Sequence, residues 1–377
     1  MQVSKKGVLA LAATAALATA CSSGAPSGSK GAKDAVEGQE VGMVGTQDQI
    51  QDIGQFCGDD DITVALADGF GGNSWRKITR AVFEAEAAKC DNITKVLYTD
   101  AQGDTQKAIA DINSLVAQDA DVIVTFVDGG EALLPTIKKA TAAGVKVVPY
   151  VGSPGGEPGE DYVDFVSEDI ATYGENLAAW TIEKMGGKGN LVMLGGLPGN
   201  SYSQGVYDGV VRAVEDHPDV TLLNSDGPVS TDWEPGKTQQ VVAGLLTKYD
   251  SIDGIVADYG GGSVGGIRAF LAANQPLPVW SANDSNEFAC LWYEHAKAQP
   301  TFQVATESSR NWVVKVALHK GLAALNGIRN EEPSTYDLEI IEDSTDPAKA
   351  PKCEDSLPPD AILSSGLTVE ELQALFD

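Results

Sequence analysis

The chain has 377 residues, which suggests two to three domains at about 150 residues each, and its formal net charge is -28. This acidity excludes a nucleic-acid partner, because phosphates are bound by clustered Lys and Arg. A content of 43% apolar and 21% charged residues excludes a disordered chain. The three histidines, His217, His295 and His319, match no metal-ligand spacing, so we expect neither a metal nor a cofactor.

Residues 1–20 have the pattern of a secretory signal. Lys5 and Lys6 precede an apolar stretch that ends at Ala20 and is shorter than the roughly 20 residues needed to cross a bilayer. Residues 17–21 resemble a bacterial lipobox, with the Leu one position further from the Cys than usual. The resemblance implies that Cys21 carries a diacylglyceryl group, whose two acyl chains anchor the exported protein stably. A plain secretory signal with a free Cys21 is the alternative.

Residues 21–60 are predicted to form a flexible tether and lead-in, because Ser, Gly, Ala and Pro dominate the first part. The four remaining cysteines of an exported chain suggest two disulfides. A right-handed β-α unit returns the end of its helix to the starting edge of its strand, which predicts the pair Cys57–Cys90. That pairing leaves Cys290–Cys353 as the second disulfide. Four buried thiols are the alternative.

From residue 62 onward, short apolar strands alternate with amphipathic helices. The helix after the first strand is marked by apolar residues at three- and four-residue spacing from Trp75 to Ala85. The other strands are expected at 95–98, 122–127, 145–151, 190–194, 220–223, 254–257, 278–281, 301–305 and 337–341. The other helices are expected at 105–118, 131–143, 170–185, 203–215, 234–249, 263–273, 286–298 and 310–325. A last short helix starts at Thr368, where Glu371 completes a capping box.

This alternation predicts an α/β fold with parallel sheets covered by helices on both faces. The series is too long for one sheet without a break, and the Gly- and Pro-rich segment 151–159 divides it into two lobes.

Polar and aromatic residues gather at the predicted carboxyl ends of the strands, where open parallel sheets bind ligands. They suit a neutral polyhydroxyl ligand, because amides and carboxylates bond to hydroxyls and an aromatic face covers the C–H side of a ring. Turns explain Gly, Asn and Asp equally well, but Trp75 and Trp233 would expose large apolar faces in polar loops. The candidate ligand-binding residues are Phe70, Asn73, Trp75, Arg76, Asp128, Asn200, Gln204, Trp233, Asp258, Tyr259, Asn283 and Asp284.

Residues 62–341 resemble type I periplasmic binding proteins of the ribose and simple-sugar group, which are extracytoplasmic receptors of ABC importers. The segments that carry the resemblance are 62–89, 98–106 and 196–201. It implies two Rossmann-like lobes that are joined by three crossings and close on a ligand by hinge bending. The implied crossings fall near 151–159, 306–309 and 328–336. The implied parts are a first lobe at 61–151 and 308–328, a second lobe at 160–306 and 336–342, and a C-terminal tail with a short helix at 343–377.

The ligand positions of the ribose-type proteins are only partly matched. Val151-Gly152 replaces an Asp-Arg pair and Gln204 replaces an Arg, whereas Trp233 and the loop from Phe70 to Trp75 keep the aromatic positions. We therefore expect a ligand other than ribose. The expected protein is a monomeric, lipid-anchored receptor outside the cytoplasmic membrane. It binds a sugar or polyol, delivers it to a membrane permease and is not an enzyme.

One glycine-rich loop supports an alternative function. The segment 260–265 matches a dinucleotide fingerprint and also a nucleophile elbow centred on Ser263, with Asp284 and His295 or His319 downstream. An exported esterase with Ser263 as the nucleophile is thus the alternative, although an HGGG-type oxyanion loop is missing. A dehydrogenase ranks lower, because an exported protein rarely meets NAD. A repressor would need an N-terminal helix-turn-helix and a basic face.

Overall fold

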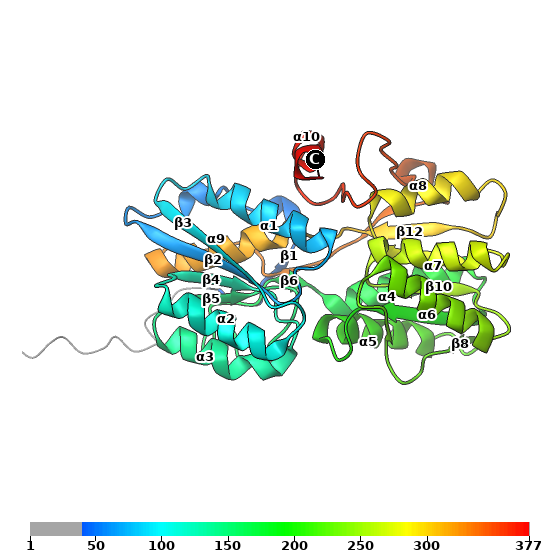
Figure 1. Ribbon diagram of the computed structural model, residues 1–377, viewed down its shortest axis with the longest axis horizontal. Coiled ribbons are helices and arrows are strands. Elements are labelled where there is room, and N and C mark those ends of the chain that lie inside the picture. The colour runs from blue at the N-terminus through cyan, green and yellow to red at the C-terminus, as the bar shows by residue number, and fades with distance from the viewer. Residues whose placement is uncertain (1–39, 377) are drawn as a thin grey trace, which may run out of the picture. The chain divides into compact units, whose positions relative to one another are not determined.

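The computed structural model describes residues 40–376. The predicted signal at 1–20, Cys21 and the first part of the tether lie outside this range. Among the described residues, no helix combines the length and apolarity that a membrane span requires. The described chain contains two large, mainly parallel sheets, each covered by helices, and a small three-stranded sheet of two-residue strands (Figure 1).

The first lobe is built on a four-stranded parallel sheet. Its strands, in the order β3-β2-β4-β5, are β2 (Ile62–Asp68), β3 (Ile93–Asp100), β4 (Val122–Thr125) and β5 (Lys146–Pro149). Its helices are α1 (Ser74–Ala87), α2 (Thr105–Ala117), α3 (Leu134–Ala142) and α9 (Val313–Asn326). Because successive strand residues point to opposite faces, Val64 and Leu66 pack with α1 and α9, and Ala65 packs with α2 and α3. Both faces are thus buried at β2, β4 and β5, as the continuous apolar runs predicted, whereas the edge strand β3 has no fully buried residue.

The second lobe has a larger sheet in the order β14-β12-β11-β10-β7-β8, with β9 (Val229–Ser230) beside β7. The path strands are β7 (Gly189–Gly195), β8 (Val220–Leu222), β10 (Gly254–Ala257), β11 (Val279–Asn283), β12 (Val304–Glu307) and β14 (Ile340–Asp343). The helices are α4 (Ile170–Lys184), α5 (Ser201–Glu215), α6 (Pro235–Lys248), α7 (Gly260–Ala272) and α8 (Asn286–His295). Strand β14 is antiparallel to β12, so this sheet is mixed at one edge.

The chain passes between the two sheets three times: after β5, between β12 and α9, and after α9. Two of these passages carry short strands, β6 (Ser167–Glu168) and β13 (Thr335–Tyr336). They pair in parallel with each other, and β13 also pairs with β1 (Val44–Gly45) from the lead-in. The lead-in is therefore ordered from β1 onward, and Ile53 and Phe56 are buried in the first lobe.

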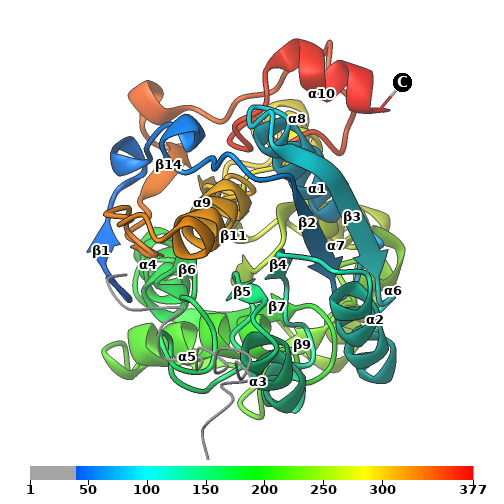
Figure 2. The ribbon, with the colours of Figure 1, turned by 90° about the vertical axis from the view of Figure 1, so that its left-hand side faces the viewer.

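Both predicted disulfides are present, with Cα–Cα distances of 5.6 Å for Cys57–Cys90 and 4.7 Å for Cys290–Cys353. The second disulfide joins α8 to the C-terminal tail. The tail ends in α10 (Val369–Phe376), which begins with the predicted capping box of Thr368 and Glu371. Helix α10 lies beside α1 of the first lobe in both views (Figures 1 and 2). The tail thus forms a further link between the lobes.

Candidate ligand-binding site

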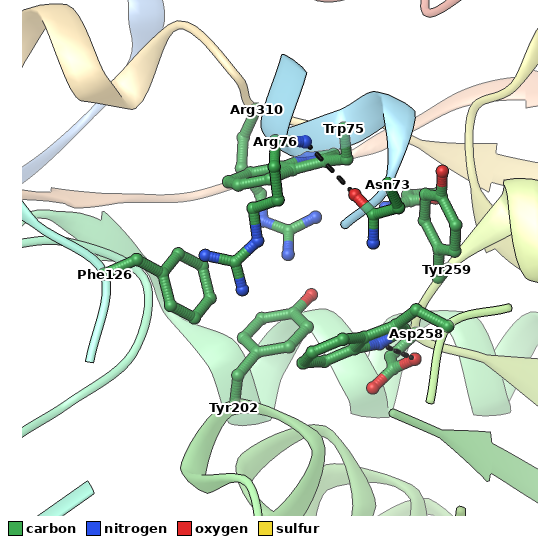
Figure 3. A pocket seen from close by; sticks show the side chains of 10 residues that line it. Asn73, Trp75, Arg76, Phe126, Tyr202, Asp258, Tyr259 and Arg310 are labelled. Carbon is green, nitrogen blue, oxygen red and sulfur yellow. Dashed lines mark hydrogen bonds between the residues drawn. The ribbon is translucent and has the colours of Figure 1, made fainter. Parts of the chain in front are cut away.

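A small cavity, with a volume of about 30 Å³, lies between the two lobes. This volume is well below the roughly 300–1,000 Å³ of small-molecule sites, so a ligand of that size enters only when the lobes move apart. The lining residues come from both lobes and from the segment between β12 and α9 (Figure 3). They are Asn73, Trp75, Arg76, Phe126, Tyr202, Trp233, Asp258, Tyr259, Asn283 and Arg310. We call this cavity the chamber.

Seven of the predicted ligand-binding residues line the chamber, namely Asn73, Trp75, Arg76, Trp233, Asp258, Tyr259 and Asn283. Phe70 and Asp128 are in contact with the lining residues Trp233 and Arg76, and Asn200 lies one step further out, where it donates to Asp128. The structure does not bring Gln204 or Asp284 into the chamber. Gln204 is exposed and donates to Asp208 on the same helix, and the carboxylate of Asp284 accepts bonds from Ser309 and Ser364.

Trp75 and Trp233 reach the chamber from opposite lobes. Trp75 lies in the first turn of α1 rather than in a loop, since Asn73 caps this helix by accepting a bond from the Arg76 amide at 3.1 Å. The Trp75 indole donates to the Ser309 carbonyl at 2.7 Å. Trp233 packs edge-on against Phe70 of the first lobe, with ring centroids 5.8 Å apart. The lobes are therefore in contact across the chamber.

Gly196 explains how the Trp233 ring is accommodated. A Cβ atom at Gly196 would lie 1.9 Å from the ring of Trp233, so only glycine permits this packing. The Trp233 indole donates to Asp258 Oδ1 at 3.0 Å, and the Ser203 hydroxyl donates to Asp258 Oδ2 at 2.5 Å. Burial raises the pKa of Asp258 to about 6, although these two donors work against the shift.

Arg76 is a buried residue of the first lobe and forms part of the chamber wall. Its guanidinium donates to Asp68 and to Asp128, each at 2.9 Å, and lies 3.5 Å from the ring centroid of Phe126. Burial raises the pKa of Asp128 to about 6 despite the neighbouring guanidinium. Asp128 also accepts a bond at 2.9 Å from the Asn200 amide of the second lobe. This hydrogen bond joins the lobes directly.

Three lining residues were not predicted from the sequence: Phe126, Tyr202 and Arg310. Phe126 falls within the strand expected at 122–127, where nothing in the sequence marks it as a ligand residue. Arg310 was assigned to the start of a helix, but α9 begins at Val313 and Arg310 has a φ of 47°. Tyr202 follows the cap of α5 and carried no separate signal.

The glycine-rich loop has a structural role in the second lobe. A Cβ atom at Gly265 would lie 1.8 Å from the Pro235 carbonyl oxygen, so glycine lets α6 and α7 pack closely. The Ser263 hydroxyl donates to the Tyr259 carbonyl and accepts a bond from the Trp280 indole, both at 3.1 Å. His319 lies in the first lobe between Glu332 and Glu86, so it is not a base for Ser263.

Within residues 40–376, Cys290, Cys353 and Asp355 have the spacing of a metal site. Both sulfurs form the disulfide, however, so they do not offer thiolates to a metal.

Residues 64–301 match the model of a family described as periplasmic binding protein domain. Over 189 residues the chain is 23% identical to the xylitol-binding protein of Mycolicibacterium smegmatis, covering 50% of this chain and 52% of that protein. Over 185 residues it is 25% identical to the ribose import binding protein of Bacillus subtilis, covering 49% and 58% respectively. The chain thus spans little more than half the length of the curated relatives it matches.

Solved structures match this chain over a larger share of their length than the curated relatives do. The crystal structure of a galactofuranose binding protein superposes with a TM-score of 0.64 at 20% identity, covering 74% of this chain and 94% of that chain. A solute binding protein of an ABC transporter from Mycobacterium smegmatis, with bound glycerol, gives a TM-score of 0.65 at 19% identity, covering 80% and 99%. At these identities the likeness shows a common fold.

Proposed function

Because the chain belongs to the type I periplasmic binding proteins of the simple-sugar group, we propose that it binds a sugar or polyol between its two lobes. The observation that carries this proposal is the chamber itself, which Trp75 and Trp233 line from opposite lobes beside buried hydrogen-bonding groups. Indole faces cover the C–H sides of a saccharide, and carboxylates, amides and guanidinium groups bond to its hydroxyls.

The charges around the chamber favour an uncharged ligand. Arg76 is paired with Asp68 and Asp128, and Arg310 is paired with Glu168. Each guanidinium therefore already has a carboxylate partner. An anionic ligand would have to enter a buried site that offers it no uncompensated positive charge, which is costly. A neutral polyhydroxyl compound avoids this cost.

In the proposed cycle, ligand contacts with both lobes stabilise the closed state, and no bond of the ligand is broken. The relatives include import and transport proteins, which supports delivery of the ligand to an ABC permease. The anchor would be a lipid on Cys21, and the protein would act as a monomer. Ser263 is not proposed as a nucleophile, since its hydroxyl is bonded to Tyr259 and Trp280.

A thermal-shift screen of sugars, polyols, nucleosides and amino acids tests the ligand class. A ligand present at 100 times its dissociation constant adds about 2.7 kcal/mol to stability. At about 2–4 °C per kcal/mol, we expect a shift of roughly 5–10 °C with at least one sugar or polyol. Shifts confined to amino acids or nucleosides would contradict the proposed ligand class.

A further inference from the structure

Arg310 belongs to neither sheet but lies on the segment that joins the lobes between β12 and α9. Its side chain is 3% exposed, and its guanidinium reaches the middle of the chamber (Figure 3). The φ of 47° places Arg310 in the left-handed region, which a non-glycine residue adopts at a cost. The amide donates to Ser308 Oγ at 3.1 Å, and the carbonyl accepts a bond from the Val313 amide at 3.0 Å.

The guanidinium of Arg310 is in contact with both lobes and with a second crossing segment. Its Nε atom forms an ion pair at 2.5 Å with Glu168, which lies in β6 on the passage after β5. The guanidinium carbon lies 4.5 Å from the ring centroid of Tyr202 in the second lobe and 5.8 Å from that of Trp75 in the first. Hinge bending moves these elements relative to one another, so the position of this side chain is coupled to closure.

Polar atoms of Arg310 and Tyr202 lack hydrogen-bond partners within the described part of the protein. Among the described residues, Nη1 of Arg310 is buried without a hydrogen-bond acceptor, and the buried hydroxyl of Tyr202 also has no partner. Buried donors are normally paired, and an unpaired one costs about 1–3 kcal/mol, with more for a charged group. The guanidinium of Arg76, in contrast, is bonded to two carboxylates. Figure 3 shows the Tyr202 hydroxyl directed toward the guanidinium groups.

We propose that Arg310 and Tyr202 bind two adjacent hydroxyls of the ligand, and that Arg310 thereby sets specificity and couples the ligand to the hinge. This inference rests on the proposed function and deepens it by assigning the ligand a vicinal diol. Glu168 compensates the charge of Arg310, so the ligand oxygens bonded to it are neutral hydroxyls rather than carboxylates. The guanidinium donates to the first hydroxyl, and the Tyr202 phenol exchanges a hydrogen bond with the second.

The proposal predicts how strongly one missing hydroxyl matters. An analogue without the hydroxyl that faces Arg310 leaves a charged donor buried and unpaired, so its affinity should fall by about 10- to 100-fold. Other monodeoxy analogues, whose missing hydroxyl faces neither residue, should lose less. Replacing Arg310 should abolish the difference in affinity between the parent ligand and the analogue that lacks this hydroxyl, because neither compound then contacts the guanidinium.

The experiment uses the full chain and the probes D-xylose, D-ribose, D-galactose and xylitol, with monodeoxy analogues of whichever compound binds. Calorimetric titrations compare wild type with Arg310→Lys, which keeps the charge but loses the planar fork. Since removing the arginine alone leaves Glu168 unpaired, the double variant Glu168→Gln/Arg310→Gln serves as a second test that removes both charges. The exposed Arg80→Gln is the matched control and should bind like wild type.

The expected result is a thermodynamic cycle in which the parent ligand and one analogue differ by about 10- to 100-fold in wild type but by less than about threefold in both Arg310 variants. Equal losses for the parent and every analogue would indicate a structural role and overturn the inference. Wild-type affinity in both variants would overturn it as well. Failure of wild type to bind any sugar or polyol would remove the proposed function together with this inference.

Discussion

Replacing Trp233 with alanine separates ligand binding from folding, because the second lobe contains a matched tryptophan in Trp180. The two side chains have similar burial, with 5% and 8% of their surface exposed. Each indole donates to a carboxylate at 3.0 Å, Trp233 to Asp258 and Trp180 to Asp343. Of the two, only Trp233 lines the chamber.

The magnitude of the effect on binding follows from the area of one indole face. A buried tryptophan removes about 150–250 Å² from water, and one face that the ligand covers as the lobes close from an open state accounts for roughly 80 Å². At about 25 cal/mol per Å², this contact contributes about 2 kcal/mol, or about 30-fold in affinity. Loss of either buried tryptophan should lower the free energy of unfolding by about 3–5 kcal/mol, so the stability losses are comparable.

The assay is a calorimetric titration of each variant with the ligand identified in the thermal-shift screen. Trp233→Ala, and likewise Trp75→Ala, should weaken binding about 30-fold, whereas Trp180→Ala should weaken it by less than about threefold. Denaturant unfolding of the same samples confirms that the compared proteins are folded at the titration temperature. Equal losses of affinity for all three variants would refute the placement of the two indole faces against the ligand.

Three further predictions concern the packing of the chamber, its protonation and the anchor. Gly196→Ala should weaken ligand binding about as much as Trp233→Ala, because the new Cβ would collide with the Trp233 ring. Gly236→Ala is the control, since a Cβ at Gly236 meets open space and should leave the affinity unchanged. Calorimetric titration is the measurement, and equal affinities of the two glycine variants would contradict the steric reasoning. The raised pKa of Asp258, about 6 against 3.8 in the unfolded chain, means that the folded state binds more protons between these values. The contribution of Asp258 to the free energy of unfolding should therefore fall as pH rises from about 4 to about 6, and Asp258→Asn should remove this contribution to the pH dependence. Denaturant unfolding across this pH range is the measurement. An unchanged pH dependence in the variant would show that Asp258 does not titrate there. Cys21→Ser should move the protein from the membrane fraction to the soluble fraction on immunoblots, and retention at the membrane would argue against a lipid anchor on this residue.

The sequence predicted the parts of the site that have a local signature. Asp and Asn after buried strands and a tryptophan in a polar segment are visible without the fold, which is why Trp233 and Asp258 were found. Arg310 has no such signature. Its backbone conformation and the ion pair with Glu168 depend on a segment far away in the chain, so helical periodicity assigned it to α9.

Gln204 was predicted to bind the ligand but lies outside the chamber because of its position around helix α5. Residues two positions apart point in different directions on an α-helix, so Tyr202 faces the chamber while Gln204 faces solvent on α5. The order of the lead-in was also not predicted, because its composition is mainly polar and only two of its described apolar residues are fully buried in the core. Ile53 and Phe56 bury themselves in the first lobe beside the disulfide Cys57–Cys90, so few apolar residues suffice to order this segment.

The C-terminal tail was predicted as a short capped helix, but its place in the fold was not. The disulfide Cys290–Cys353 holds it to the second lobe, and α10 buries Leu372 and packs against α1 of the first lobe. Such contacts join segments from opposite ends of the sequence, and neither composition nor periodicity specifies them.

A crystal structure of the protein with the ligand from the thermal-shift screen would show whether the ligand binds in the chamber between the lobes. We expect electron density for an unmodified sugar or polyol in the chamber, in contact with Trp75, Trp233 and Arg310. Density for the ligand in the outer hollow of the second lobe near Tyr249 and Pro278, with the chamber unchanged, would contradict it.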